Sequence, residues 1–178
     1  IQLPIDDGVV GLRGLSPQRH RFELEYALER GSTANSVLFE AGDGAPAVLV
    51  HPPGVAYSTA FLPVLAEALP TSDGPLVVVV GHVNPNRVAL LRDLAEAYAG
   101  LELIVSNPGA KLIEELWSQR KPAPHGETSE QPPLPDLPPL RVIRQEQTLP
   151  LSHQRSLMLL PAPTPRWPGG LLSLIHIS

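Results

Sequence analysis

Continuous apolar runs and helical apolar repeats alternate along much of this 178-residue chain. The apolar runs at 47–50, 76–80 and 101–105 predict buried strands, because a strand covered on both faces carries apolar side chains at every position. The intervening segments 58–69 and 88–99 predict helices. Strands that alternate with helices in this way are typical of an α/β layered fold.

Cap residues refine where the helices begin. Ser58 or Thr59 is the expected N-cap of the first helix. A third helix is predicted from Asn107, because Asn is a favourable N-cap residue and Pro108 then occupies the first helical position. The apolar stripe of this third helix ends at Trp117, which we expect in the core.

Weaker patterns predict further strands at both ends of this region. Residues 21–28 alternate apolar and charged side chains, and they are expected to form a hairpin with 36–40. Residues 140–144 and 155–160 are also expected to be strands.

Composition sets the expected boundaries. We assign 1–15 to an N-terminal extension and 16–171 to one incomplete domain. Of the 22 prolines, many fall in 121–140, a segment with few apolar side chains that predicts an extended, disordered insertion. Residues 172–178 match the translation of a transposon-sequencing adapter, so we expect that this segment, with His176, is not native.

Charge and cysteine content exclude several classes of protein. The formal net charge is −5 and there is no basic stripe, which argues against a nucleic-acid partner. The apolar runs are much shorter than the roughly 20 residues of a membrane-spanning helix. The chain has no cysteine, which excludes disulfides, thiolate-bound metals and a cysteine nucleophile. These features predict a soluble, cytosolic type of protein.

Functional groups of α/β sheets gather in the loops after the carboxyl ends of strands, which here are 51–54, 81–87 and 161–170. The middle loop resembles the H-x-E-x-D-H metal loop of β-lactamase-like proteins. His82 matches the first ligand. Asn84 stands where the family has Glu, Asn86 where it has Asp, and Arg87 where it has the second His.

Three other segments support the same resemblance in colinear order. Residues 162–168 resemble the A-P-x-x-H-W-P segment of flavodiiron proteins, with Arg166 in place of the metal-binding His. Residues 31–36 are similar to that family's G-T-x-x-N-S stretch, and 103–117 resemble the strand and helix after the metal loop. Together these matches resemble the diflavin flavodiiron proteins of cyanobacteria and chloroplasts.

This resemblance implies a metallo-β-lactamase-like αββα sandwich, truncated here. In the whole protein it implies an FMN-binding flavodoxin-like domain and a flavin-reductase domain, FMN/FAD and NAD(P)H as cofactors, and reduction of oxygen to water at a di-iron site. It also implies cyanobacterial cytosol or chloroplast stroma as the location. Because members of the family associate, we expect a homo-oligomer or a hetero-oligomer with a ligand-complete paralogue.

The side chains at the matched positions argue against iron in this chain. Iron in such sites takes carboxylates and neutral imidazoles, whereas Asn offers a neutral carbonyl and Arg offers no lone pair. We therefore expect no bound metal, no bound cofactor and no catalytic residue in this chain alone. His82, Arg87, Arg166 and Trp167 are candidates for contacts to a pocket or to an anion.

Other residues are expected to have structural roles. His51 is predicted to be structural, and His20, His125 and His153 are expected to be solvated. For Trp167, core packing is favoured over a place in a pocket wall or a contact with the flavin of a partner subunit. No G-x-S-x-G segment is present, which argues against a nucleophilic serine. The alternative to an oxidoreductase fragment is a non-catalytic β-lactamase-like interaction or scaffold domain.

Overall fold

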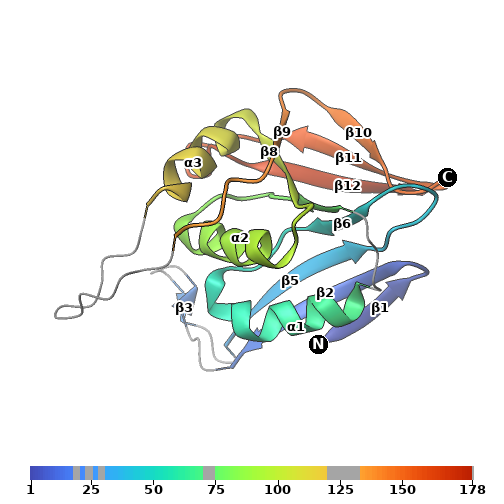
Figure 1. Ribbon diagram of the computed structural model, residues 1–178, viewed down its shortest axis with the longest axis horizontal. Helices are drawn as coiled ribbons and strands as arrows, with labels where there is room; N and C mark the ends of the chain where they lie inside the picture. Colours follow the sequence, from blue (N-terminus) through green and yellow to red (C-terminus); the bar gives the residue numbers. More distant parts are fainter. Residues whose placement is uncertain (18–20, 23–25, 28–30, 70–74, 120–132, 178) are drawn as a thin grey trace.

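The predicted apolar strands form the centre of a mixed seven-stranded sheet in the computed structural model, which describes residues 1–17, 21–22, 26–27, 31–69, 75–119 and 133–177 (Figure 1). In spatial order, the strands are β1 (Gln2–Asp6), β2 (Val9–Ser16), β5 (Ser32–Phe39), β6 (Ala47–Val50), β7 (Leu76–Val79), β8 (Glu102–Ser106) and β9 (Leu140–Ile143). The strands from β6 to β9 pair in parallel, and those from β1 to β6 pair antiparallel.

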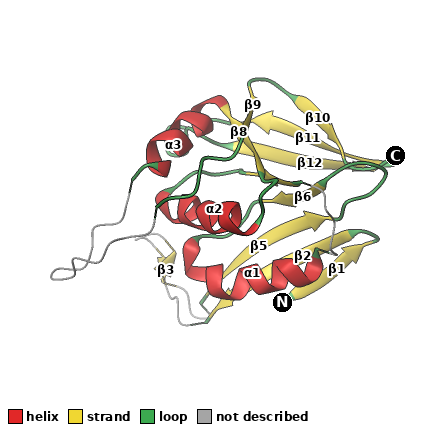
Figure 2. Cartoon of the chain, in the orientation of Figure 1, coloured by secondary structure: helices red, strands yellow, loops and turns green. Residues whose placement is uncertain are grey.

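Three helices cover one face of this sheet (Figure 2). They are α1 (Ser58–Ala68), which follows the short 3-10 helix η1 (Val55–Tyr57), α2 (Pro85–Ala97) and α3 (Asn107–Trp117). Parallel neighbours need a crossover connection, and α1, α2 and α3 provide those after β6, β7 and β8. Across the described ranges, no helix is long and apolar enough to cross a membrane.

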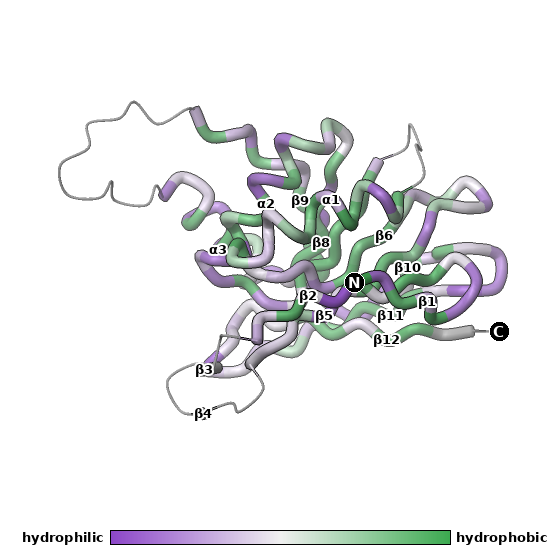
Figure 3. The backbone as a smooth tube through the Cα atoms, turned by 90° about the horizontal axis from the view of Figure 1, so that it is seen from below, coloured by the Kyte–Doolittle hydropathy of each residue, from purple (hydrophilic) through white to green (hydrophobic). Residues whose placement is uncertain are grey.

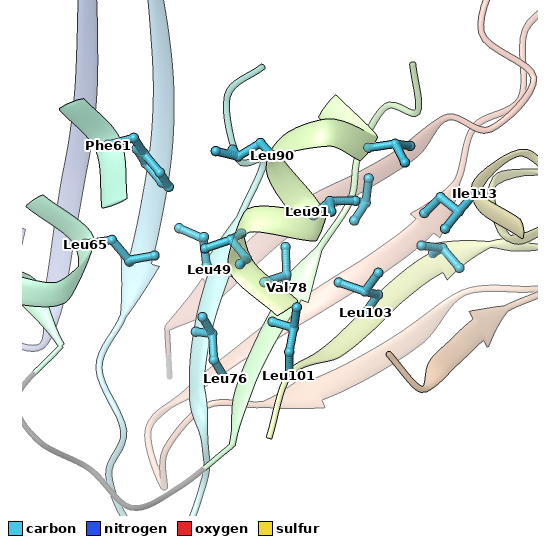
Figure 4. Close-up of a cluster of buried hydrophobic side chains, with 14 of the residues drawn as sticks. Leu49, Phe61, Leu65, Leu76, Val78, Leu90, Leu91, Leu101, Leu103 and Ile113 are labelled. Atoms are coloured by element: carbon cyan, nitrogen blue, oxygen red, sulfur yellow. The ribbon is translucent and has the colours of Figure 1, made fainter. Parts of the chain in front are cut away.

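The main core lies between these helices and the sheet. Leu90 and Leu91 of α2 lie against Leu49, Val78 and Leu103 of the three central strands, and all five side chains are fully buried (Figure 4). Full burial of each such side chain contributes about 1.5–3 kcal/mol. This packing fixes the position of α2 relative to the ends of β6 and β7.

A second, three-stranded antiparallel sheet packs on the opposite face. Its strands are β10 (Gln147–Pro150), β11 (Arg155–Pro161) and β12 (Leu171–Ile177). Val77 and Val79 point to this second sheet whereas Val78 points to the helices, as the alternation of side chains along a strand requires. The central strands β6 and β7 are therefore apolar throughout, and β6 has the colour of hydrophobic residues in Figure 3.

The resulting layers are helices, sheet and sheet, which is the order expected for three successive layers of an αββα sandwich. Helices cover only one side of the part that the structure describes, so the sandwich has three of its four layers there.

The N-terminal residues differ from the prediction. Residues 1–15 were assigned to an extension, but they contain β1 and most of β2, at the antiparallel edge of the main sheet. Glycines interrupt the apolar alternation of β2, and this concealed the strand. Gly14 is required there, because a Cβ would lie 2.6 Å from the Tyr57 ring.

The predicted hairpin of 21–28 with 36–40 is wrong. Residues 21–22 and 26–27 form two short strands, β3 (Arg21–Phe22) and β4 (Tyr26–Ala27), that pair antiparallel with each other. The strand β5 pairs instead with β2 and β6, because Leu38 and Phe39 are buried in the cores on either face of the main sheet. The rest of the predicted strand lies outside the described residues.

The proline-rich segment is partly packed. Of 121–140, residues 121–132 lie outside the described residues, but from 133 onward the chain contacts the core: the Trp117 indole donates to the Pro135 carbonyl (2.9 Å), and Leu137 packs on the apolar cluster. Prediction of disorder was wrong for this second part. Residues 172–177 pair with β11 as part of β12, and their adapter origin stays a prediction.

Candidate functional site

The loop that resembles a metal loop is the start of α2. This helix begins at Pro85, three residues before the predicted start, with Asn84 as N-cap. The Asn84 side-chain oxygen accepts a hydrogen bond from the Arg87 backbone N–H (2.8 Å), so Asn86 and Arg87 lie in the first helical turn. An Asn-Pro pair is a recognisable helix start, and it was overlooked because the loop was compared with a metal motif.

A cavity of about 820 Å³ lies at the carboxyl ends of β6 and β7, next to this first turn. All three loops that the sequence analysis selected contribute to it, and the beginning of β5 forms a further wall. The lining residues are Ser32, Thr33, Ala34, Asn35, His51, Pro53, Gly54, Tyr57, His82, Asn84, Asn86, Arg87 and Trp167. Of the five positions matched to family ligands, Arg166 alone is not part of this lining.

Arg87 is a buried cation at the base of the cavity, with 9% of its surface exposed. Its Nε donates to the Pro52 carbonyl (2.7 Å) and its Nη1 to the His82 carbonyl (2.8 Å), while Nη2 lies 3.5 Å from Nε2 of His51. The guanidinium therefore bridges the loops after β6 and β7. Burial lowers the pKa of Arg87 to about 10, which leaves it charged at neutral pH.

His51 is held in a backbone conformation that a histidine rarely adopts, with φ of 60°. Its carbonyl accepts from the Ser36 hydroxyl (2.9 Å), and its N–H donates to the Val79 carbonyl (3.0 Å). Burial, and then the charges of Arg87 and His82, lower the pKa of His51 to about 4. The imidazole is thus neutral at pH 7, and its Nε2 can accept from Arg87.

Trp167 forms the outer wall of the cavity. The residue is 43% exposed, and its ring makes an edge contact with His82 at 5.7 Å between centroids, so the prediction that it packs in the core is wrong. The guanidinium carbon of Arg166 lies 5.6 Å from the Trp167 ring centroid, in a cation–π contact. Trp117 is 6% exposed, which confirms its predicted place in the core.

Ser106 fixes the loop that carries Trp167. Its hydroxyl donates to the Gly169 carbonyl (3.0 Å) and accepts from the Gly109 N–H (3.1 Å). Ser106, and not the predicted Asn107, is therefore the N-cap of α3. In α1 the prediction of a Ser58 or Thr59 cap also fails, because Tyr57 is the N-cap and no side chain supplies a cap hydrogen bond.

Among the described residues, the cavity wall carries imidazoles, amides, hydroxyls and one guanidinium, but no carboxylate. Within the described ranges, no three His, Cys, Asp or Glu side chains are grouped so that they could hold a metal ion. His153 is exposed near Asp43, as predicted for a solvated residue. His20 and His125 lie outside the described residues.

Two contributions to the cavity were missed. His51 was assigned a structural role, although its place directly after a buried strand was a signal for a cavity residue. Tyr57 and the wall from β5 had no local signal, because the pairing of β5 with β2 and β6 brings Ser32–Asn35 to the cavity only in the folded chain.

Comparisons with solved structures identify proteins with a similar fold and a related sequence. The chain is 31% identical to the metal-soaked Flv1 flavodiiron core from Synechocystis sp. PCC6803, with a TM-score of 0.77 over 97% of this chain and 38% of that one. It is 29% identical to a fragment (1–254) of putative diflavin flavoprotein A 5 from Nostoc sp. PCC 7120, with a TM-score of 0.78 over 97% of this chain and 61% of that one. These matches define a metallo-β-lactamase-like core of the flavodiiron class.

The sequence relatives specify the family further. The chain is 36% identical over 165 residues to putative diflavin flavoprotein A 6 from Nostoc sp. PCC 7120, and the aligned region covers 93% of this chain and 25% of that protein. No family model matches the chain. The chain belongs to the diflavin flavodiiron protein family, and it spans about a quarter of the length of the relatives that it matches.

Proposed function

We propose that this chain is the core of a diflavin flavodiiron oxidoreductase in which the former di-iron pocket holds no iron. One observation carries the proposal: Arg87, at the position that resembles the second metal-binding His, directs its guanidinium to the carbonyls of Pro52 and His82. A protonated side chain thus bridges the two loops that border the pocket.

The donor chemistry of the neighbouring positions supports the same conclusion. The side-chain oxygen of Asn84 accepts a hydrogen bond as the cap of α2, and Asn86 offers a neutral amide. Neither can supply the anionic oxygen that di-iron sites use. Two positive unit charges about 4 Å apart repel each other by roughly 4 kcal/mol at an effective dielectric of about 20. The positive charge of Arg87 therefore further disfavours a metal ion in the pocket.

In the whole protein, we propose that electrons pass from NAD(P)H through FAD and FMN toward oxygen, in cyanobacterial cytosol or chloroplast stroma. The names of the relatives as diflavin flavoproteins support the two flavins. Since the described residues of this pocket include no carboxylate and no group of three metal-ligating side chains, oxygen reduction would take place in a partner subunit. A hetero-oligomer with a ligand-complete paralogue supplies such a site.

Metal analysis tests the proposal. The chain is incubated anaerobically with excess Fe(II), desalted, and assayed for iron by elemental analysis. We expect less than one iron for every ten chains. The matched variant restores family ligand types through Asn84→Glu, Asn86→Asp, Arg87→His and Arg166→His, and it is expected to retain more iron. Two irons retained by the unaltered chain would contradict the proposal.

Association with a partner is tested separately on full-length proteins. The gene that encodes this chain is co-expressed with a ligand-complete diflavin paralogue, and one protein carries an affinity tag. We expect a mixed oligomer with iron in proportion to the paralogue. Purely separate homo-oligomers would remove the partner from the proposal and leave the iron result unaffected.

A further inference from the structure

The charge of Arg87 has no counter-charge in the part of the chain that the structure describes. Its contacts are two backbone carbonyls and the neutral His51 ring. The three ion pairs of the described residues are Arg141–Glu102, His153–Asp43 and Arg155–Asp6, and none of them includes Arg87. Burial of a cation without an anionic partner is costly, so this site favours a negative charge.

Arg87 also has unused donors. A guanidinium has five N–H groups, and three of them take part in the contacts with Pro52, His82 and His51. The other two, on Nη1 and Nη2, have no acceptor among the described residues. Because Arg87 lines the cavity, a molecule inside it can reach these donors.

The surroundings of Arg87 add to the positive potential. Arg87 lies in the first turn of the 13-residue helix α2, where the backbone N–H groups and the helix dipole favour an anion. The amide of Asn86 adds a further donor to the lining, and no carboxylate among the described lining residues competes for Arg87.

We propose that the cavity binds a small, planar, singly charged oxyanion or carboxylate against the guanidinium of Arg87. This inference rests on the proposed function, since a pocket with iron would leave no place for the anion. One guanidinium charge matches one negative charge, and its planar fork matches the geometry of a carboxylate or nitrate group. Tyr57 and Trp167 supply aromatic walls, and Trp167 lies at the entrance.

Formate and nitrate are suitable probes, because they represent the carboxylate and inorganic sources of the same chemistry. The chain of 178 residues is titrated with each sodium salt at pH 7.5 and constant ionic strength, and binding is followed by calorimetry and by the thermal unfolding midpoint. Ligands of three or four heavy atoms are limited to Kd values of roughly 0.1–10 mM. We expect saturable binding in this range, with a rise in the unfolding midpoint.

Two variants of Asn84 provide matched controls, because both retain the cap of α2. Asn84→Asp places a fixed negative charge in the cavity wall and is expected to weaken anion binding by at least about tenfold. Asn84→Ser retains a neutral cap, so the ratio of the Kd values of the two variants isolates the effect of the added charge. The inference is overturned if neither anion binds saturably, or if Asn84→Asp binds as tightly as Asn84→Ser.

Iron is measured on the same samples. No anion binding together with no iron overturns only this inference, whereas stoichiometric iron overturns the proposed function. A response to formate alone or to nitrate alone supports the inference and identifies the source of the ligand.

Discussion

Two arginines of α2 bind backbone carbonyls in two different surroundings. Arg87, in the first turn, bridges the loops beside the cavity. The side chain of Arg92, five residues later in α2, reaches the C-terminal end of α3. There its Nη2 donates to the carbonyls of Leu116 (2.6 Å), Trp117 (2.7 Å) and Gln119 (2.9 Å). A cation at a helix C-terminus is favoured by the helix dipole and by the unpaired carbonyls of the last turn.

The difference between the two regions lies in what covers the cation. The Trp117 ring lies 5.8 Å from the guanidinium carbon of Arg92, and its indole donates to the Pro135 carbonyl, so this region is filled by side chains and by the returning chain. Beside Arg87 there is a cavity instead. The same residue type therefore stabilises packing in one region and leaves room for a ligand in the other.

Removal of the covering aromatic residue should have the largest effect. Trp117→Ala is expected to lower the free energy of unfolding by about 4 kcal/mol, because it leaves a large cavity and removes the contact with Arg92 and the hydrogen bond to Pro135. Urea unfolding followed by circular dichroism measures this loss.

Trp167→Ala is the matched change in the other region. The side chain is partly exposed, and its contacts with His82 and Arg166 lie at the surface of the cavity, so the expected loss is below about 1 kcal/mol. Equal losses for the two tryptophans would show that the cavity region is packed as firmly as the region of Arg92.

Stability in acid should depend on the cavity region. The pKa of His51 is about 4 in the folded chain and about 6.5 when unfolded, so only the unfolded chain gains a proton on this residue as the pH falls from 6.5 to 4. The stabilisation is therefore complete above pH 6.5 and is lost through this window, by up to about 3 kcal/mol. Urea unfolding at a series of pH values measures the loss.

His51→Asn is the control for this pH dependence. Asn tolerates the positive φ of this position and does not titrate, so the variant should lose the part of the pH dependence that belongs to His51. An unchanged profile in this variant would assign the acid sensitivity to other groups.

Local patterns were sufficient for the central elements. The apolar runs of β6, β7 and β8 and the helices between them were predicted, because burial on both faces leaves no other pattern for a short strand. The edge strand β1 and its neighbour β2 were missed. The positions of these strands depend on their pairing in the folded chain. Gly14 interrupts the apolar pattern of β2 because a side chain there would clash with Tyr57, which is distant in sequence.

At the site, too, local patterns predicted some features, whereas others depend on contacts between distant parts of the chain. The loops of His82 and Trp167 were predicted, because they follow strands and resemble family motifs. Local sequence could not show that Arg87 turns to the carbonyls of Pro52 and His82, or that Arg166 lies over Trp167 outside the cavity lining. Such orientations depend on which neighbours the fold brings within hydrogen-bond distance.

The comparison of the two arginines can be tested directly with Arg92→Met and Arg87→Met. The first removes hydrogen bonds to the end of α3, with an expected loss of about 2 kcal/mol. The second removes two charge-assisted hydrogen bonds, but it also removes a charge whose desolvation, judged from its lowered pKa, costs about 3 kcal/mol. These effects largely offset each other, so a net loss of only about 1 kcal/mol is expected in anion-free buffer. A larger loss for Arg87→Met than for Arg92→Met would mean that the Arg87 bridge is the stronger of the two structural contacts.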